Sequence, residues 1–398
     1  MKIAFIAPFG IRPKGTVIAR MIPLAVGLNG LGHEVAIIAP PYTNPEDSGK
    51  TEMVRGVLIK NISLGPSNKA IAALVLARRL YLAAMAEHPD LVHLFKPKGY
   101  GGVAAFAHIL LRRLGRRLPP IFVDVDDWEG QGGMNELHPY TWGERTIFGL
   151  QEEWLQKHAS AVTAASRTLL ARTRDLGIPP ERVIYLPNGV DDLPPGNGNR
   201  IRTKLGIPAD APVVLLYTRF FEFDQGRLHR IFAGICRQLP GVRFLVVGRG
   251  RSGEEEQLAD AGEVLGFASA LVMAGWVEPE DIPDYLAVGD VALYPFADTL
   301  VNRAKCPAKL TELLRAGVPV VADNVGQLAE YINPGISGIL CYPGDWREMA
   351  DRAVELLRDK GKSQAIGEAG RRNLLDNFRW SNFATKLTEF YALNGRQL

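Results

Sequence analysis

The sequence predicts an α/β protein of two consecutive domains, each built on a doubly wound parallel sheet. Short apolar runs alternate with amphipathic stretches of helical period through most of the 398 residues. Strands that are apolar along their whole length belong to parallel sheets that helices cover on both faces. The alternation is interrupted once, near mid-chain, by a segment rich in proline, glycine and asparagine, and then restarts. Such a segment indicates a domain boundary.

The first half of the chain gives a regular order of elements. Its first apolar run, residues 3–7, is too short for a signal peptide and meets Gly10 and Pro13 without a cleavage-like site, so we interpret it as a buried strand. We expect strands at residues 3–7, 34–39, 91–94 and 121–125, and helices at residues 16–31, 70–86 and 101–114.

The second half repeats this pattern after the segment around residues 187–199. We expect strands at residues 213–217, 243–247, 271–274, 291–294, 318–322 and 338–341. A last amphipathic helix over residues 381–393 has Ser381 as its expected N-cap. The predicted domains are therefore residues 1–190 and 200–375, and residues 376–398 form a helix expected to pack back on the first domain.

Composition favours a cytoplasmic globular protein. The three scattered cysteines, Cys236, Cys306 and Cys341, form neither a disulfide framework nor a zinc motif. No apolar run has the length of a membrane helix. Residues 1–200 carry a net charge of +5 and the remainder −2, and ten basic residues against two acidic ones lie between residues 60 and 120. This excess forms either a solvated surface or a peripheral contact with the inner face of a membrane, in which a helix over residues 104–118 would take part.

Candidate binding residues lie where strands of such sheets end. Gly15 follows the first strand and precedes a helix, so backbone N–H groups there can approach a phosphate, although a plain turn explains it as well. Arg219 follows the strand at residues 213–217, where its guanidinium can grip a diphosphate or pair with Glu222. The glycines after residue 247 match only half of a dinucleotide motif and predict a turn.

The segment from Lys305 to residue 330 is the most informative. Pro307 suits the first turn of a helix, and Gly317 suits its C-terminal end. Glu312 lies inside this helix, near the end where ligands bind. A carboxylate there can accept two hydrogen bonds from a sugar diol, and the alternative is a solvated glutamate.

Four carboxylates lie at the end of the strand at residues 121–125 or just after it: Asp124, Asp126, Asp127 and Glu129. They suggest an acid/base or magnesium site, whereas the lack of His or Cys nearby disfavours zinc. Helix capping and solvated charge are the alternative.

The chain resembles the retaining glycosyltransferases with two Rossmann-like domains, the GT-B fold and the large family 4 group. The similarity covers nearly the whole chain and rests on four segments in order: residues 31–35 (LGHEV), 187–191 (PNGVD), 310–321 (LTELLRAGVPVV) and 335–345 (GISGILCYPGD). It implies two domains that face each other across a cleft, with a nucleotide-sugar (UDP- or GDP-sugar) on the C-terminal domain and the acceptor on the N-terminal domain.

The resemblance also implies roles for individual residues. Glu312 matches the second glutamate of the family's two-glutamate motif, which binds the nucleotide ribose, and Arg219 matches the arginine on the diphosphate. Gly15 lies against that diphosphate and Val277 near the base. The remaining donor-binding candidates are Arg227, Lys305, Cys306, Pro307, Ala308, Lys309 and Leu310, and the acceptor-side candidates are Lys14, Asp126 and Asp127.

Three positions depart from the family pattern. Ala304 replaces the first glutamate, as in relatives with a Pro-x-Lys-Leu segment, which residues 307–310 resemble. Gln225 stands near the place of the diphosphate lysine, whose charge Arg227, Arg230 or Lys305 could supply. Asp126 stands at about the place of a histidine of the catalytic region. The catalytic candidates are Arg219, Glu312 and Asp126.

The resemblance implies a hexosyltransferase that retains the anomeric configuration, and we expect that it needs neither a metal nor another cofactor. The acceptor is a glycan or a lipid-linked molecule, and no nucleic acid is expected as a partner. Ala304 and Gln225 leave open an inactive nucleotide-sugar-binding or scaffolding protein. A sugar-nucleotide epimerase or a phosphorylase-like enzyme on the same architecture is the other alternative.

Overall fold

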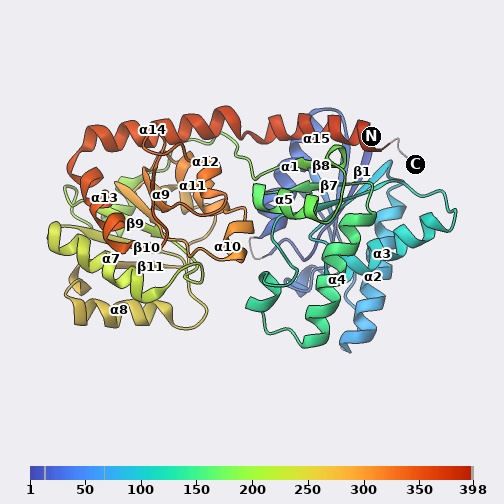
Figure 1. The fold of residues 1–398 in the computed structure, drawn as a ribbon, viewed down its shortest axis with the longest axis horizontal. Helices are drawn as coiled ribbons and strands as arrows, with labels where there is room; N and C mark the ends of the chain where they lie inside the picture. The colour runs from blue at the N-terminus through green and yellow to red at the C-terminus, as the bar shows by residue number, and fades with distance from the viewer. Residues whose placement is uncertain (13–14, 67, 396–398) are drawn as a thin grey trace. The chain divides into compact units, whose positions relative to one another are not determined.

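The protein is described by a computed structural model over residues 1–12, 15–66 and 68–395. The chain divides into two compact units. The first contains Met1–Gly189, Ala304–Cys306 and Trp380–Leu398, and the second contains Val190–Arg303 and Pro307–Arg379. Each is a parallel α/β unit, as the apolar runs predict (Figure 1).

The first unit has a sheet in the order β3-β4-β2-β1-β5-β6-β7-β8. All its neighbouring strands are parallel except the β3–β4 pair. Its strands are β1 (Lys2–Ile6), β2 (Glu34–Ala39), β3 (Thr51–Val54), β4 (Val57–Asn61), β5 (Leu91–Phe95), β6 (Ile121–Val125), β7 (Ala161–Ala164) and β8 (Val183–Tyr185). The antiparallel hairpin of β3 and β4 and the strands β7 and β8 were not predicted.

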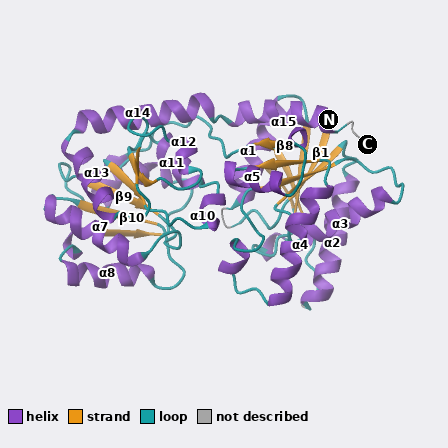
Figure 2. Cartoon of the chain, in the orientation of Figure 1, coloured by secondary structure: helices purple, strands orange, loops and turns teal. Residues whose placement is uncertain are grey.

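The second unit has a fully parallel sheet in the order β11-β10-β9-β12-β13-β14. Its strands are β9 (Val213–Tyr217), β10 (Arg243–Val247), β11 (Leu271–Gly275), β12 (Val291–Tyr294), β13 (Val320–Asp323) and β14 (Ile339–Cys341). Successive residues of β9 enter two separate apolar clusters. The sheet is therefore buried on both faces, and helices cover it on both sides (Figure 2).

Helices connect the parallel strands. In the first unit they are η1 (Val17–Met21), α1 (Ile22–Gly30), η2 (Pro45–Asp47), α2 (Lys69–Ala86), α3 (Gly99–Arg113), η3 (Met134–Leu137), α4 (Trp142–His158), α5 (Arg167–Asp175), η4 (Pro180–Arg182) and α15 (Trp380–Asn394). Between Gly189 and α15 the chain forms α6 (Gly198–Lys204), α7 (Gln225–Gln238), α8 (Glu254–Leu265), η5 (Ala268–Ala270), α9 (Ile282–Leu286), α10 (Leu300–Ala304), α11 (Ala308–Arg315), α12 (Leu328–Tyr331), α13 (Trp346–Arg358) and α14 (Lys360–Asn377).

Three helix ends differ from the prediction. The helix expected to extend to residue 118 ends at Arg113, because Gly115 turns the chain with a φ of 86°. Ser381 lies inside α15, which begins one residue earlier. Pro307 is the N-cap of α11 and not part of its first turn. Gly317 does follow the C-cap of α11, with a φ of 73°.

Candidate functional site

The strand order of the second sheet reverses between β9 and β12. In doubly wound sheets, ligands bind outside the carboxyl ends of the strands at this reversal. A small pocket lies there, and α11 contributes one side chain to it. Its polar lining residues are Tyr217, Thr218, Glu222, Tyr294 and Lys309.

A lysine, a tyrosine and a glutamate meet at this pocket. The Lys309 ammonium lies 3.4 Å from the centre of the Tyr217 ring, a close cation–π contact. Burial raises the pKa of Tyr217, and the carboxylate of Glu312, which accepts a hydrogen bond from the phenol, raises it further. Helix α11 places both charged residues on this ring, because Lys309 and Glu312 are separated by nearly one turn. The cluster offers a cation and a carboxylate at the mouth of β9.

Arg219 lies two residues beyond the end of β9. One guanidinium nitrogen of Arg219 lies 3.3 Å from the carboxylate of Glu222, and the guanidinium rests on the Phe221 ring at 4.9 Å. Its side chain is 52% exposed, so its remaining N–H groups can reach a ligand. Both roles considered for Arg219, the ion pair and a diphosphate contact, are compatible with this geometry.

Other predicted donor residues have partners within the second unit. Arg227 forms a buried, two-pronged ion pair with Asp323, with N–O distances of 2.6 and 2.8 Å. Gln225 donates a hydrogen bond to the carbonyl of Phe220 at 2.6 Å. Val277 packs against the apolar cluster below the sheet. Arg227 therefore holds the end of β13, and its role in donor binding stays a prediction.

The segment before α11 is divided between the two units. Ala304, Lys305 and Cys306 belong to the first unit, whereas Pro307, Ala308 and Leu310 belong to the second. Ala304 is fully buried, and its carbonyl accepts a hydrogen bond from the Ser166 hydroxyl at 2.9 Å.

Cys306 is held by one asparagine. The backbone N–H of Asn188 donates to the Cys306 sulfur at 3.0 Å, and the Asn188 side chain donates to the Cys306 carbonyl at 3.0 Å. Lys305 is also buried in this unit, with 5% of its surface exposed. Contacts in the first unit therefore fix the backbone of 304–306.

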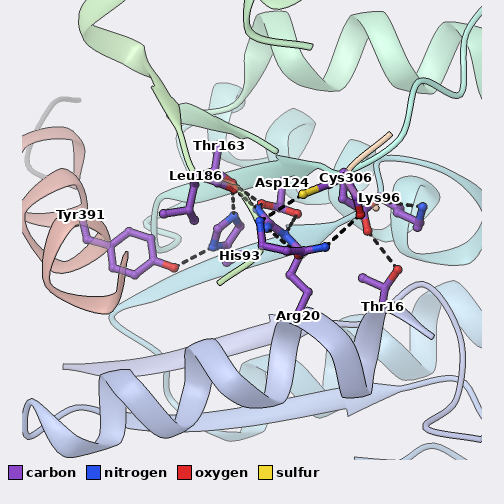
Figure 3. A network of polar contacts seen from close by, with 11 residues as sticks. Thr16, Arg20, His93, Lys96, Asp124, Thr163, Leu186, Cys306 and Tyr391 are labelled. Atoms are coloured by element: carbon purple, nitrogen blue, oxygen red, sulfur yellow. Dashed lines mark hydrogen bonds and ion pairs between the residues drawn. The ribbon is translucent and has the colours of Figure 1, made fainter. Parts of the chain in front are cut away.

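A buried ion pair lies at the centre of the first unit (Figure 3). The Arg20 guanidinium donates to both oxygens of Asp124 at 2.8 and 2.6 Å and to the Leu186 carbonyl at 2.7 Å. Burial opposes the charge of Arg20, but the carboxylate of Asp124 raises the pKa of Arg20 above its ordinary value. Asp124 also accepts a hydrogen bond from Thr163. Asp124 thus serves the fold, although the sequence grouped it with the candidate acid/base or magnesium site.

Lys96 neutralises the remaining acids at the carboxyl edge of this sheet. Its ammonium lies 2.8 Å from Asp126 and also pairs with Asp127. Burial alone would lower the pKa of Lys96, and the surrounding carboxylates raise it well above its ordinary value. The other oxygen of Asp126 accepts a hydrogen bond from Thr16 at 2.9 Å.

Burial raises the pKa of Asp126, and the charge of Lys96 works in the opposite direction. Within the described residues, no three His, Cys, Asp or Glu side chains are arranged to hold a metal ion. Asp126 and Asp127 balance the charge of the buried Lys96 ammonium. The acceptor and catalytic roles of Asp126 and Asp127 stay predictions.

Gly15 lies at the start of the π-helical turn η1, where its carbonyl accepts a hydrogen bond from Ala19 at 2.9 Å. Gly15 follows the carboxyl end of β1, and Lys96 follows the carboxyl end of β5. The two strands are parallel, so both residues lie at the same edge of the sheet. The strand order reverses between these two strands, so this is the ligand-binding edge of the first unit. Lys14, an acceptor-side candidate, lies outside the described residues.

Sequence reasoning missed Lys96 and Arg20. Each carried a signal: Lys96 follows five apolar or aromatic positions of a strand, and Arg20 is the one charge in the apolar stretch 17–28. The backbone of Lys96 has a φ of 55°, which is uncommon for a residue with a side chain. Strain of this kind concentrates where the surrounding contacts determine the conformation.

The comparisons with known proteins agree with this architecture. Residues 15–189 match the family described as "Glycosyl transferase 4-like domain", and residues 211–359 match "Glycosyl transferases group 1". The structure of Anabaena HepE in complex with UDP superposes with a TM-score of 0.70 at 20% identity, over 98% of this chain and 100% of that one. The fold is thus the GT-B fold of two Rossmann-like domains.

Two curated relatives are similar over part of their length. A 2-deoxystreptamine glucosyltransferase from Streptomyces kanamyceticus is 26% identical over 57% of this chain and 59% of its own. A GDP-mannose-dependent phosphatidylinositol monomannoside mannosyltransferase from Mycolicibacterium smegmatis is 28% identical over 60% of this chain and 63% of its own. The match therefore spans about three-fifths of each relative. The chain belongs to the family 4 glycosyltransferases.

None of the helices in the described parts of the chain combines the length and the apolar character that crossing a bilayer would require.

Proposed function

We propose that the protein is a hexosyltransferase that transfers a sugar from a UDP- or GDP-sugar to an acceptor. The observation that carries this proposal is the cluster of Lys309, Tyr217 and Glu312 at the strand reversal of the second unit. A carboxylate beside a cation suits a nucleotide, since the carboxylate accepts hydrogen bonds from ribose hydroxyls and the cation faces phosphate. Family membership and relatives that use GDP-mannose support the same donor class.

The reaction breaks the bond between the anomeric carbon and the diphosphate oxygen. In the retaining course that we propose, the acceptor oxygen attacks from the face that the diphosphate leaves. The acceptor proton passes to an oxygen of the departing nucleoside diphosphate. Negative charge grows on that diphosphate, and preorganised cations lower the barrier by stabilising it. Arg219 and Lys309 supply this charge, and the proposed reaction uses no metal ion.

The sugar cannot be held in the usual way of the family, because Ala304 replaces the first glutamate and has no exposed surface. We propose that backbone N–H groups at the start of α11 take over this contact, since the first N–H groups of a helix have no partner within the helix. Pro307 at the N-cap contributes no such group, which leaves the positions from Ala308 onward.

Substitution of the two charged residues tests this proposal. Glu312→Gln and Arg219→Gln should each reduce transfer by about tenfold or more, as expected for the loss of a charge-assisted contact of about 1.5–3 kcal/mol. Matched controls are Glu368→Gln and Arg372→Gln, which change exposed residues of α14 and should leave the rate unchanged. The measurement is release of nucleoside diphosphate from a panel of UDP- and GDP-sugars. Normal rates in both site variants would contradict the assignment.

Further measurements identify the nucleotide base and separate the alternative functions. A thermal-shift screen against UDP, GDP and ADP identifies the base, because a ligand at 100 times its dissociation constant adds about 2.7 kcal/mol of stability. Donor binding without diphosphate release in the presence of any acceptor would favour the scaffolding protein, and conversion of the donor sugar itself would favour the epimerase. Loss of transfer on adding a chelator would contradict the metal-free reaction.

A further inference from the structure

The first unit has an open pocket at the edge of its sheet opposite to the edge where Asp126 lies. The pocket has a volume of about 1080 Å³, and its lining includes Ile121, where β6 begins, Ser160, just before β7, and Arg182, just before β8. These parallel strands start at this amino edge and end at the edge where Asp126 lies. A strand of five residues separates the two edges by about 15 Å.

The pocket is strongly basic. Six cationic side chains line it, and no carboxylate does: Arg112, Arg113, Arg116, Arg117, Lys157 and Arg182. None of the six makes an ion pair within the residues that the structure describes. Cations gathered in a concave surface repel one another and focus a positive potential, which attracts an anion.

Hydrogen bonds hold two of the arginines, Arg182 on backbone carbonyls and Arg112 on the Ser160 hydroxyl. Arg182 donates from Nε to the Ser160 carbonyl at 2.9 Å and from Nη2 to the carbonyl of Ala159. Arg112 donates from Nη1 to the Ser160 hydroxyl at 3.2 Å. Because a guanidinium has five N–H donors, both residues keep donors for a ligand after these contacts. They are already ordered, so binding costs little of their side-chain entropy.

The end of α3 brings the other arginines to the same pocket. The left-handed turn at Gly115 separates Arg112 and Arg113 from the exposed Arg116 and Arg117, and all four line the pocket. Burial lowers the pKa of Arg112, since no carboxylate offsets the loss of water around its charge. A bound anion would remove this cost.

We propose that this pocket binds a phosphate group, at a site separate from the one that takes the nucleotide-sugar. Guanidinium groups pair with phosphate oxygens in two-pronged hydrogen bonds, and several converging arginines match an anion of more than one charge. The phosphate belongs either to a soluble phosphorylated molecule or to a phospholipid headgroup. Leu110 on α3 and Leu114 at its C-cap, which are 46% and 73% exposed, would contact acyl chains in the second case.

The test uses the full chain and two probes. The soluble probe is tripolyphosphate, titrated by calorimetry in the presence of saturating UDP and GDP, so that the nucleotide site does not compete. The lipid probe is a set of phosphatidylglycerol vesicles, with phosphatidylcholine vesicles as the neutral reference. The variant is Arg116→Gln with Arg117→Gln, whose side chains are exposed, and Lys157→Gln, an exposed pocket residue of α4, is a second variant.

A matched control removes two positive charges elsewhere, by Lys360→Gln with Arg372→Gln, two exposed positions of α14. We expect the pocket variants to bind one of the two probes about tenfold or more weakly than the unchanged protein does. The control should bind both probes as the unchanged protein does. Selective loss of tripolyphosphate binding identifies a soluble ligand, and selective loss of phosphatidylglycerol binding identifies a headgroup. Equal binding by variants and control, or no binding of either probe by the unchanged protein, would overturn the proposal.

Discussion

At the scale of single residues, the first unit depends on a buried ion pair between Arg20 and Asp124. Arg20 is 1% exposed and Asp124 has no exposed side-chain surface. Replacing both partners of such a pair by apolar residues can be harmless, whereas removing one leaves the other charge buried without compensation. Arg20 also donates a hydrogen bond to the Leu186 carbonyl, and Asp124 accepts one from the Thr163 hydroxyl. Four separate parts of the chain therefore meet at this ion pair.

We predict that Asp124→Asn destabilises the protein by about 3–5 kcal/mol, because the Arg20 guanidinium loses its counter-charge. Urea unfolding followed by circular dichroism measures this loss. Asp298→Asn is the control: Asp298 pairs with Arg303 on the surface, where both side chains are at least 40% exposed, and the midpoint should hardly change. A similar small shift for Asp124→Asn would show that water or another group solvates Arg20.

At the scale of elements, glycines set where helices end. Gly115 has a φ of 86° and lies two residues after Arg113, where α3 ends, whereas Gly149 lies inside α4 with ordinary helical geometry. A Cβ atom at either position would meet no heavy atom within 4 Å. The effect of an alanine at these positions is therefore purely conformational.

We predict opposite effects for the two alanine substitutions. Gly115→Ala should destabilise the protein by about 1 kcal/mol, since alanine resists a positive φ. Gly149→Ala should stabilise it by about 0.5–1 kcal/mol, since alanine favours the helix. Thermal unfolding of the two variants side by side measures both shifts. An equal sign for the two would mean that α3 continues past Arg113 in solution.

At the scale of the whole molecule, the last helix returns to the unit that the chain left at Gly189. Helix α15 packs on α1, and the hydroxyl of Tyr391 lies 2.6 Å from Nδ1 of His93 in strand β5. His93 is fully buried, and burial lowers its pKa to about 4. A proton taken up by the His93 ring would have to fit the hydrogen bonds that join His93 to Tyr391 and to Thr163, which in turn donates to Asp124.

We predict that His93 makes the protein less stable in acid. Its pKa is about 4 when folded and about 6.5 when unfolded, so the unfolded state binds more protons between these values. The contribution of neutral His93 to the free energy of unfolding is therefore full above pH 6.5 and is lost as the pH falls toward 4. The loss from this group amounts to up to about 3 kcal/mol. The difference in unfolding free energy between the protein and His93→Gln, measured from pH 7 to 4.5, isolates the effect. A difference independent of pH would contradict it.

Much of the fold could be predicted because apolar strands are a local signal. The strands at residues 34–39, 121–125, 213–217, 243–247 and 291–294 were predicted with the bounds that the structure has. The β3–β4 hairpin was missed because its residues are partly exposed and mixed in polarity, as befits the edge of a sheet. Helix ends were less certain than strands, because a cap depends on a single residue and its φ.

The sequence by itself determined the fold class, the family and the segment that supplies Lys309 and Glu312, because these depend on periodicity and on residues close together in the chain. Only the tertiary structure decided which charges pair with each other. Arg20 meets Asp124 across 104 residues, and Arg227 meets Asp323 across 96. The six cations of the basic pocket likewise converge from α3 and the turn after it, from α4 and from η4. Charges attract through space, so sequence separation carries no information about such partners.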